Sequence, residues 1–338
     1  MSPQRRLGVV LAALALALLA AMAAALFLGA AAVPPGAVVA ALLGRAEEPV
    51  SRLVVLDLRL PRIVAAALAG GALAVAGAAF QALTRNPLAE PSVLGVSSGA
   101  AFGVVCGQLF GLGVSVWDAF GLTAFAFAGA FVAGGIVYLI AQSQGGFSVH
   151  TLLLAGVIVG IFFSSAVAVV ISLVDTNRLG GIIQWLLGSV SPIAPGALGV
   201  FALVTLSGLA LVLVDARRLN LLALGDDAAR ELGVDATWVK RRIFGGAALL
   251  VSAAVAFAGP IGFVGLIVPH ALRMLLGPDN RVLVPAALLA GGIFLLVVDT
   301  VARNVVAPAE LSAGVLTAFC GAPFFVYLMR ARGARVAL

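Results

Sequence analysis

Charged side chains are scarce in this chain of 338 residues: Asp, Glu, Lys and Arg make up only 10% of it, and Lys240 is its single lysine. A soluble domain of ordinary size is excluded, because the longest polar stretch, about 215–242, is much shorter than a domain. Hydrophobic residues make up 63% of the chain, and the mean hydropathy is +1.19. These values predict a multi-pass membrane protein with a single transmembrane domain over residues 1–338.

Cysteine and histidine are also rare, with two of each. Cys106 and Cys320 lie inside apolar runs, and we interpret them as small core residues rather than a disulfide. The cysteines and the histidines, His150 and His270, do not have the spacing of a zinc site. No Ser, His and Asp constellation stands out. The sequence therefore predicts neither a metal site nor catalytic residues in this chain.

The chain lacks the G-x-x-x-x-G-K-[ST] motif of nucleotide-binding loops, because its only lysine is followed by Arg241. Its acidic residues lie in polar segments or near the ends of apolar runs, whereas a proton-driven carrier usually places such a group deep in the membrane. An external energy source is therefore the simpler interpretation. An ion-coupled secondary transporter is a distant alternative, and an intramembrane enzyme a more distant one.

The apolar runs predict an all-α polytopic protein with about ten transmembrane helices. We expect them at about 7–33, 61–83, 92–112, 119–141, 151–174, 195–214, 243–257, 259–276, 282–301 and 311–329. Residues 36–57 are expected to form an external loop with at most one short amphipathic helix. The net charge of +6 comes from arginines between the runs, most of them on the side of the N-terminus. This bias predicts that both termini are cytoplasmic, and it explains the charge without a nucleic-acid partner.

Small residues recur at every fourth position in three of the predicted helices, so each set lies along one helix face. Such a face lets another helix approach closely. In the second and third helices we interpret the sets as packing surfaces, whereas the set in the fifth could pack or line a water-filled path. The three sets are Ala66, Gly70, Ala74 and Ala78; Gly95, Gly99, Gly103, Gly107 and Gly111; and Gly156, Gly160, Ser164, Ala168 and Ser172.

Two segments rich in proline or glycine interrupt the apolar pattern. One is Asn86 to Pro91, between the second and third helices on the inner side. The other, Gly259 to Pro269, lies between the seventh and eighth helices on the outer side. Paired interruptions on opposite sides suggest an inverted repeat.

The sequence resembles the permease subunits of ABC importers for iron–siderophore complexes, haem and cobalamin. The resemblance covers most of the chain and rests on seven segments. They are L-R-L-P-R (58–62), G-A-L-A-V-A-G-A-A-F-Q-A-L (71–83), N-P-L-A-E-P (86–91), L-G-V-S-S-G-A (94–100), L-G-D-D-A-A-R-E-L-G (224–233), G-P-I-G-F-V-G-L-I-V-P-H (259–270) and A-E-L-S-A-G-V-L-T-A-F-C-G-A-P-F-F (309–325).

This resemblance implies a bundle like that of the cobalamin permeases, in the bacterial inner membrane. Two copies of the chain would pair, and two ATPase subunits would bind the cytoplasmic face. A periplasmic binding protein would deliver the substrate. ATP and Mg²⁺ would be held by the partner ATPase, so no cofactor is expected in this chain, and lipid would surround it.

The resemblance also implies functional residues. Arg59, Arg62 and Arg303 would receive acidic residues of the binding protein, with lipid-headgroup contact as the alternative. The ATPase would contact a short helix, for which a solvated loop helix is the alternative. The residues expected to couple the chain to the ATPase are Gly225, Asp226, Asp227, Ala228, Ala229, Arg230, Glu231, Leu232 and Gly233.

The substrate is less clearly encoded. Candidate residues of the substrate path are Arg178, Ser164, Gly160 and His150. Arg178 could pair with a propionate or another carboxylate, or serve as an interfacial anchor, and His150 could border the inner gate or be an ordinary interfacial histidine. We favour haem or another ferric chelate over cobalamin as the substrate.

Overall fold

The computed structural model describes residues 3–29, 31–45, 48–109, 116–143, 146–174, 176–306 and 309–336. Within these ranges seven helices are long and apolar enough to cross a membrane: Leu7–Phe27, Pro49–Thr84, Gly121–Ala141, Val149–Leu173, Pro195–Val214, Ala236–Ala258 and Asn280–Asn304. Three shorter apolar helices are Val96–Leu109, Val264–Leu276 and Ala313–Val326. Together they correspond one to one with the ten predicted spans, so the all-α polytopic class is confirmed.

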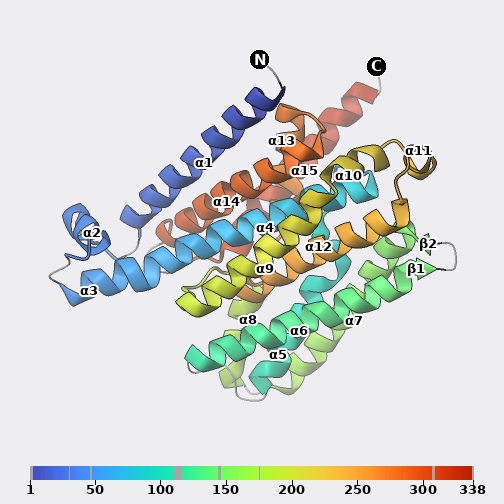
Figure 1. Ribbon diagram of the computed structural model, residues 1–338. Coiled ribbons are helices and arrows are strands. Elements are labelled where there is room, and N and C mark those ends of the chain that lie inside the picture. The colour runs from blue at the N-terminus through green and yellow to red at the C-terminus, as the bar shows by residue number, and fades with distance from the viewer. Residues whose placement is uncertain are drawn as a thin grey trace.

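The helices run side by side in one bundle (Figure 1). In chain order the elements are α1 (Pro3–Phe27), α2 (Pro35–Leu42), α3 (Pro49–Arg52), the π-helix η1 (Leu53–Arg59), α4 (Leu60–Thr84), the 3₁₀-helix η2 (Pro91–Leu94), α5 (Val96–Leu109), α6 (Val116–Ala141), β1 (Gln142–Ser143), β2 (Gly146–Phe147), α7 (Val149–Leu173), α8 (Thr176–Leu186), α9 (Pro195–Val214), α10 (Ala216–Leu222), α11 (Asp226–Glu231), α12 (Ala236–Ala258), α13 (Val264–Leu276), α14 (Asn280–Asn304) and α15 (Ala313–Val336). The two short strands pair antiparallel.

Helix α4 forms the centre of the bundle, where it packs against α12, α13 and α14. Gly70 on α4 and Gly291 on α14 let these two helices approach closely: a Cβ on either glycine would lie 2.2–2.3 Å from the carbonyl oxygen of the other. Ala66, Ala74 and Ala78 on the same face are fully buried. The small-residue face predicted for the second span is therefore confirmed as a packing surface.

The glycines of α5 pack in the same way against α6. A Cβ at Gly99 would lie 2.5 Å from the carbonyl oxygen of Gly129, and one at Gly103 would lie 2.0 Å from that of Phe125. Gly95, which precedes α5, contacts Gly160 of α7. These contacts confirm the predicted packing face of the third span, except at Gly111, which lies outside the described residues.

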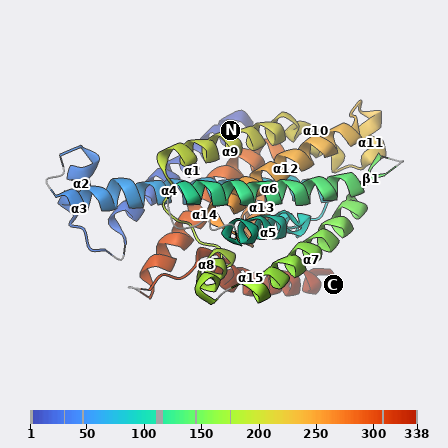
Figure 2. The same ribbon diagram turned by 90° about the horizontal axis from the view of Figure 1, so that it is seen from below.

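Both ends of the chain lie at the same end of the bundle as α11, and α2 and α3 lie at the opposite end (Figure 1). Seen from below, α2 and α3 project beyond the other helices (Figure 2). This arrangement is the one expected for an even number of spans. The assignment of the α11 end to the cytoplasm stays a prediction from the arginine bias.

The expected external loop at 36–57 is wrong. Helix α2 occupies its first part, and a continuous helix of 36 residues, Pro49–Thr84, begins twelve residues before the predicted start at Pro61. Arg45, Glu47, Glu48 and Arg52 suggested a loop because charge is costly within a bilayer. A helix of this length extends well beyond the roughly 30 Å hydrocarbon layer, however, so its outer end can carry charge.

The seventh span also starts earlier than predicted. Helix α12 begins at Ala236, and the side chain of Asp235 accepts a hydrogen bond from the Trp238 backbone N–H at 3.0 Å. The residues before 243 are polar, so they were predicted to lie outside the span. Asp235 is nevertheless a favoured N-cap residue and marks the true start of the helix. Lys240 and Arg242 therefore lie on α12 itself rather than in a preceding loop.

The two interrupted segments meet inside the bundle, which contradicts their predicted separation on opposite sides. The Phe263 backbone N–H, at the start of α13, donates a hydrogen bond of 2.6 Å to Glu90 Oε1. A Cβ at Gly77 would lie 1.9 Å from the carbonyl oxygen of Gly265, close to the same point. Helix α13 begins at Val264 rather than Gly259, since Gly259 and Phe263 both have positive φ. The inverted repeat stays a prediction, because interrupted helices of two inverted halves can meet within the bundle.

Candidate functional site

A short helix, α11, stands at the tip of the bundle (Figure 1). Gly225 precedes it with φ 120°, and Gly233 follows it with φ 78°, conformations that glycine adopts without strain. Asp226 and Asp227 occupy the first turn, where negative charge is favourable. The helix predicted at this position is therefore present, and Gly225 and Gly233 mark its two ends.

Ion pairs join α11 to two long helices. Asp226 pairs with Lys240 on α12 and with Arg85 at the C-terminus of α4. Burial raises the pKa of Asp226, but the Lys240 hydrogen bond and the positive charges of Lys240, Arg85 and Arg230 outweigh it and hold this pKa below its ordinary value. The carboxyl group is thus charged at neutral pH and fixes α11 to both helices.

The two sides of α11 differ in character. Ala229 is fully buried against the bundle, whereas Leu224 and Leu232, which flank the helix, are 67% and 59% exposed. Asp227 and Arg230 form an exposed pair at 3.0 Å, which contributes little stability. Ala229 therefore belongs to the internal packing, and the exposed leucines form the outward apolar contact surface.

A polar cavity of about 570 Å³ separates α11 from the end of α7. Thr84 and Arg85 line it from α4, and Lys240 lines it from α12. Ser148, which accepts a hydrogen bond from the Thr151 backbone N–H, and His150 line it at the start of α7. The structure thus brings His150 together with the α11 residues, at one end of the helix that also carries Gly160 and Ser164.

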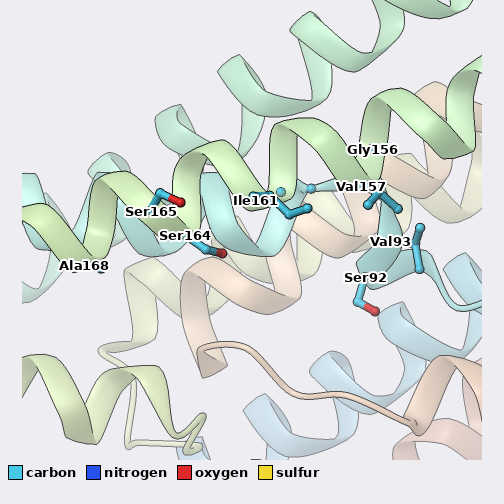
Figure 3. A pocket seen from close by; sticks show the side chains of 10 residues that line it. Ser92, Val93, Gly156, Val157, Ile161, Ser164, Ser165 and Ala168 are labelled. Atoms are coloured by element: carbon cyan, nitrogen blue, oxygen red, sulfur yellow. The ribbon is translucent and has the colours of Figure 1, made fainter.

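A groove of about 470 Å³ runs along α7, with Gly156, Gly160 and Ser164 among its lining residues. Figure 3 shows the hydroxyl groups of Ser164 and Ser165 on α7 and that of Ser92 on the neighbouring segment. The Ser164 and Ser98 hydroxyls lie 3.1 Å apart and form a hydrogen bond. The small-residue face of α7 therefore both packs, at Gly156, and lines an open groove, at Ser164.

The same helix exposes large apolar side chains. Leu154, Ile161 and Phe162 are 62–65% exposed, and Leu173 is 80% exposed. Arg178, the remaining candidate, lies on α8 beyond the end of α7, and its side chain falls outside the described part of the structure. Ser164 and Gly160 thus line one groove, while His150 lies at the opposite end of α7 from Arg178.

Arg59 is not an outward-facing arginine. Its side chain is 5% exposed and donates hydrogen bonds to the carbonyl oxygens of Leu26, at 2.6 Å, and Ala31, at 2.5 Å. Leu26 lies in the last turn of α1, where the carbonyls lack partners within the helix, and Ala31 lies in the segment that follows it. Arg59 therefore ties α1 to the start of α4, which corrects the expectation that this guanidinium is open to a partner protein.

Arg62 and Arg303 converge on one buried carboxylate. Arg62 lies 3.0 Å from Asp299 Oδ1, Arg303 Nε lies 3.2 Å from Asp299 Oδ2, and Asp299 is 1% exposed. Arg62 also pairs at 2.8 Å with Glu310, which is 47% exposed. Docking by these arginines stays a prediction, but only the Arg62–Glu310 side of the cluster opens to solvent.

Asp299 and Glu310 carried no predicted role. The spacing of Asp299 and Arg303, four residues apart on one helix, is the local signal that could have identified their pair. The pairing with Arg62 joins residues more than two hundred positions apart, so spacing alone could not have revealed it.

Residues 16–331, nearly the whole chain, match the sequence pattern of the FecCD transport family. The chain belongs to the FecCD transport family. One relative, the cobalamin import system permease protein of Halobacterium salinarum, is 42% identical over 84% of this chain and 75% of its own length. The hemin transport system permease protein of Yersinia pestis is 40% identical over 81% of this chain and 82% of its own length.

A solved structure of an ABC transporter, described as inward-facing and assigned to the metal-chelate type, resembles this FecCD chain in three dimensions. The TM-score is 0.81 at 33% sequence identity, and the match covers 96% of this chain and 99% of the other. The fold and family expected from the sequence motifs are therefore both confirmed.

Proposed function

We propose that this chain is the permease subunit of an ATP-driven ABC importer. The observation that carries the proposal is α11, a short helix with exposed leucines at its flanks, which ion pairs connect to α4 and α12. A bundle without a nucleotide-binding loop of its own needs a surface through which motion reaches it. In this proposal α11 sits in a cleft of the partner ATPase, which holds ATP and Mg²⁺.

The proposed complex contains two copies of this chain, two ATPase subunits and a periplasmic binding protein, in the inner membrane of a bacterium with both termini cytoplasmic. The apolar face of α7 supports pairing, because Leu154, Ile161 and Phe162 are largely exposed and Ile161 also lines the serine-containing groove. A second copy facing this surface would enclose a path between the two chains.

The proposed substrate is haem or another ferric chelate. The two relatives named above carry haem and cobalamin in their names at nearly equal identity, and the similar solved structure is assigned to metal chelates. Cobalamin is therefore the second candidate, favoured by the 42% identity to a cobalamin permease. Each of these substrates is a bulky metal complex, for which a path between two protein chains is more suitable than a narrow pore within one.

The cognate binding protein offers the sharpest test of the substrate. Its affinity should be measured by titration calorimetry with haem, a ferric hydroxamate and cobalamin in parallel. The proposal expects tight binding of haem or the ferric hydroxamate and at least tenfold weaker binding of cobalamin. A preference for cobalamin would replace the substrate assignment but leave the permease assignment unchanged.

A separate test addresses coupling. Leu232→Asp should abolish substrate-dependent stimulation of the partner ATPase in the assembled complex, because it places a charge on the exposed apolar flank of α11. Leu43→Asp, the same change at a comparably exposed leucine outside the membrane-spanning helices, serves as the control. Full stimulation in the Leu232 variant would contradict the role assigned to α11.

A further inference from the structure

A second groove, of about 470 Å³, opens between α6, α9 and α12 at the end of the bundle that carries α11. Its walls are mainly apolar and include Phe131 on α6, Leu211 on α9 and Leu249 on α12. Its volume falls within the range of ordinary small-ligand sites. The groove is separate from the α7 groove and from the cavity beneath α11.

Glycines keep this groove open. Gly135 on α6 and Gly245 on α12 both line it, and a Cβ at either position would have no neighbour within 4 Å. Phe131, which also lines it, is 70% exposed. In a membrane such a groove faces the acyl chains of lipid, since it lies on the outer surface of helices that span the bilayer.

Two arginines, Arg241 and Arg242, line the end of the groove that lies near the start of α12. Arg242 pairs with the buried Asp215 at 3.0 Å. Arg241 has no hydrogen-bond or ion-pair partner within the described residues, and its Nε atom is buried. The apolar walls and the unpaired guanidinium therefore meet at the same site.

The charge around this end is positive. Arg218 shares Asp215 with Arg242, so one carboxylate serves two arginines. Asp235, the acidic residue one turn before Trp238, caps α12 through the Trp238 backbone N–H. Because Asp215 and Asp235 have these other partners, neither compensates the charge of Arg241. A phosphate group would supply both a hydrogen-bond acceptor and the opposite charge.

Two aromatic residues indicate the depth of the site in the membrane. Trp238 is 53% exposed, and both Trp238 and Tyr138 line the groove at its arginine end. Trp and Tyr are enriched at the level of the lipid headgroups, and basic pockets between transmembrane helices bind anionic headgroups. The arginine end of the groove thus lies where a phosphate headgroup would be, and the apolar walls extend toward the bilayer core.

We propose that this groove binds an anionic phospholipid, with one acyl chain along α6, α9 and α12 and the phosphate on Arg241. The site rests on the membrane-spanning fold and not on the proposed substrate. Because Arg241 lies near the start of α12, which follows α11 in the chain, a lipid bound there would stabilise the position of α11.

Native mass spectrometry of the full-length chain in detergent tests the proposal. The protein is titrated with phosphatidylglycerol and, separately, with phosphatidylcholine of the same acyl chains. An arginine near the membrane surface strengthens binding of an anionic lipid by about fivefold. We therefore expect phosphatidylglycerol to bind at least about fivefold more tightly than phosphatidylcholine.

Two variants separate the headgroup from the acyl chain. Arg241→Gln should lose most of the preference for phosphatidylglycerol. Gly245→Leu should weaken binding of both lipids, because a Cβ at this position has no neighbour within 4 Å and the leucine side chain would occupy the groove. Arg52→Gln, an exposed arginine at the opposite end of the bundle, and Gly199→Leu, an exposed glycine of α9 with open space around it, are the matched controls.

Equal binding of the two lipids by the wild-type chain would overturn the proposal, as would an unchanged preference in Arg241→Gln. Unchanged binding of both lipids by Gly245→Leu would place the acyl chain elsewhere and so refute this groove as the site. Release of bound phosphatidylglycerol on addition of the partner ATPase would assign the groove to that protein instead.

Discussion

Asp299 holds together the arginine cluster at the α2 end of the bundle, and its removal should be costly. Its carboxylate is 1% exposed and pairs with Arg62 and Arg303, whose side chains are 11% and 5% exposed. Asp299→Asn keeps the shape of the side chain but removes its charge. Two nearly buried guanidinium groups would then share a neutral amide, and only Arg62 would retain a carboxylate partner, Glu310.

The expected loss follows from the burial of the three groups. Removing one partner of a buried ion pair costs about 3–5 kcal/mol, because the remaining charge is left without compensation. Glu310→Gln makes the same change of charge and breaks a contact with the same Arg62. Because Glu310 is 47% exposed, that change should cost only about 0–1 kcal/mol.

Thermal unfolding of the purified full-length chain in detergent, followed by tryptophan fluorescence, measures this difference. With about 2 °C per kcal/mol for a large domain, Asp299→Asn should lower Tm by about 6 °C or more. Glu310→Gln should lower Tm by no more than about 2 °C. Equal shifts for the two variants, or no shift for Asp299→Asn, would refute the reasoning that this cluster is structural.

The same geometry changes how docking should be tested. Reversal of Arg303 to Glu would place a second carboxylate beside Asp299, so loss of transport in that variant would not separate docking from misfolding. Glu310→Gln is the better probe, since it frees one side of Arg62 and leaves the buried pair intact. Tighter docking of the binding protein to this variant would support a docking role for Arg62.

Three further predictions concern separate sites. Ala229→Trp should lower stability as well as coupling, because Ala229 is fully buried, whereas Ala228→Arg should lower ATP-coupled transport with Tm unchanged; thermal unfolding and uptake distinguish the two. Hydrogen bonds from Arg281 and Asn220 lower the pKa of Asp279 to about 2, so this carboxylate should contribute stability above about pH 4 that is lost as the pH falls toward 2. Chemical denaturation at a series of pH values should show that the free energy of unfolding depends less on pH in Asp279→Asn than in the wild type. Arg178→Ala should slow haem uptake without weakening docking, and equal uptake by variant and wild type would leave Arg178 as an interfacial anchor.

Local patterns in the sequence predicted the helices and the faces on which two of them pack. Glycines at spacing four predicted the packing face of α5, and Gly225 and Gly233 predicted the ends of α11, because each rule depends on residues near one another in the chain. Charged residues led to the wrong prediction of a loop over Pro49–Arg59, where a helix extends beyond the membrane.

Contacts between residues that are distant in sequence could not be predicted from such local patterns. The hydrogen bond from Phe263 to Glu90 and the pairing of Arg62 with Asp299 join segments that are distant in sequence. The sequence identifies arginines that break the charge bias, but it does not say whether their partners lie within the chain or on another protein. Only the folded arrangement shows that the Arg59 guanidinium donates to the carbonyl groups of Leu26 in α1 and of Ala31 in the segment after it.

Uptake into proteoliposomes tests the central claim most directly. Vesicles that contain this chain and its partner ATPase should be given the binding protein loaded with labelled haem, with ATP either present or absent inside. The account predicts accumulation that requires ATP, the ATPase and the binding protein together, and that Leu232→Asp abolishes. Accumulation driven by a proton gradient without ATP would contradict it.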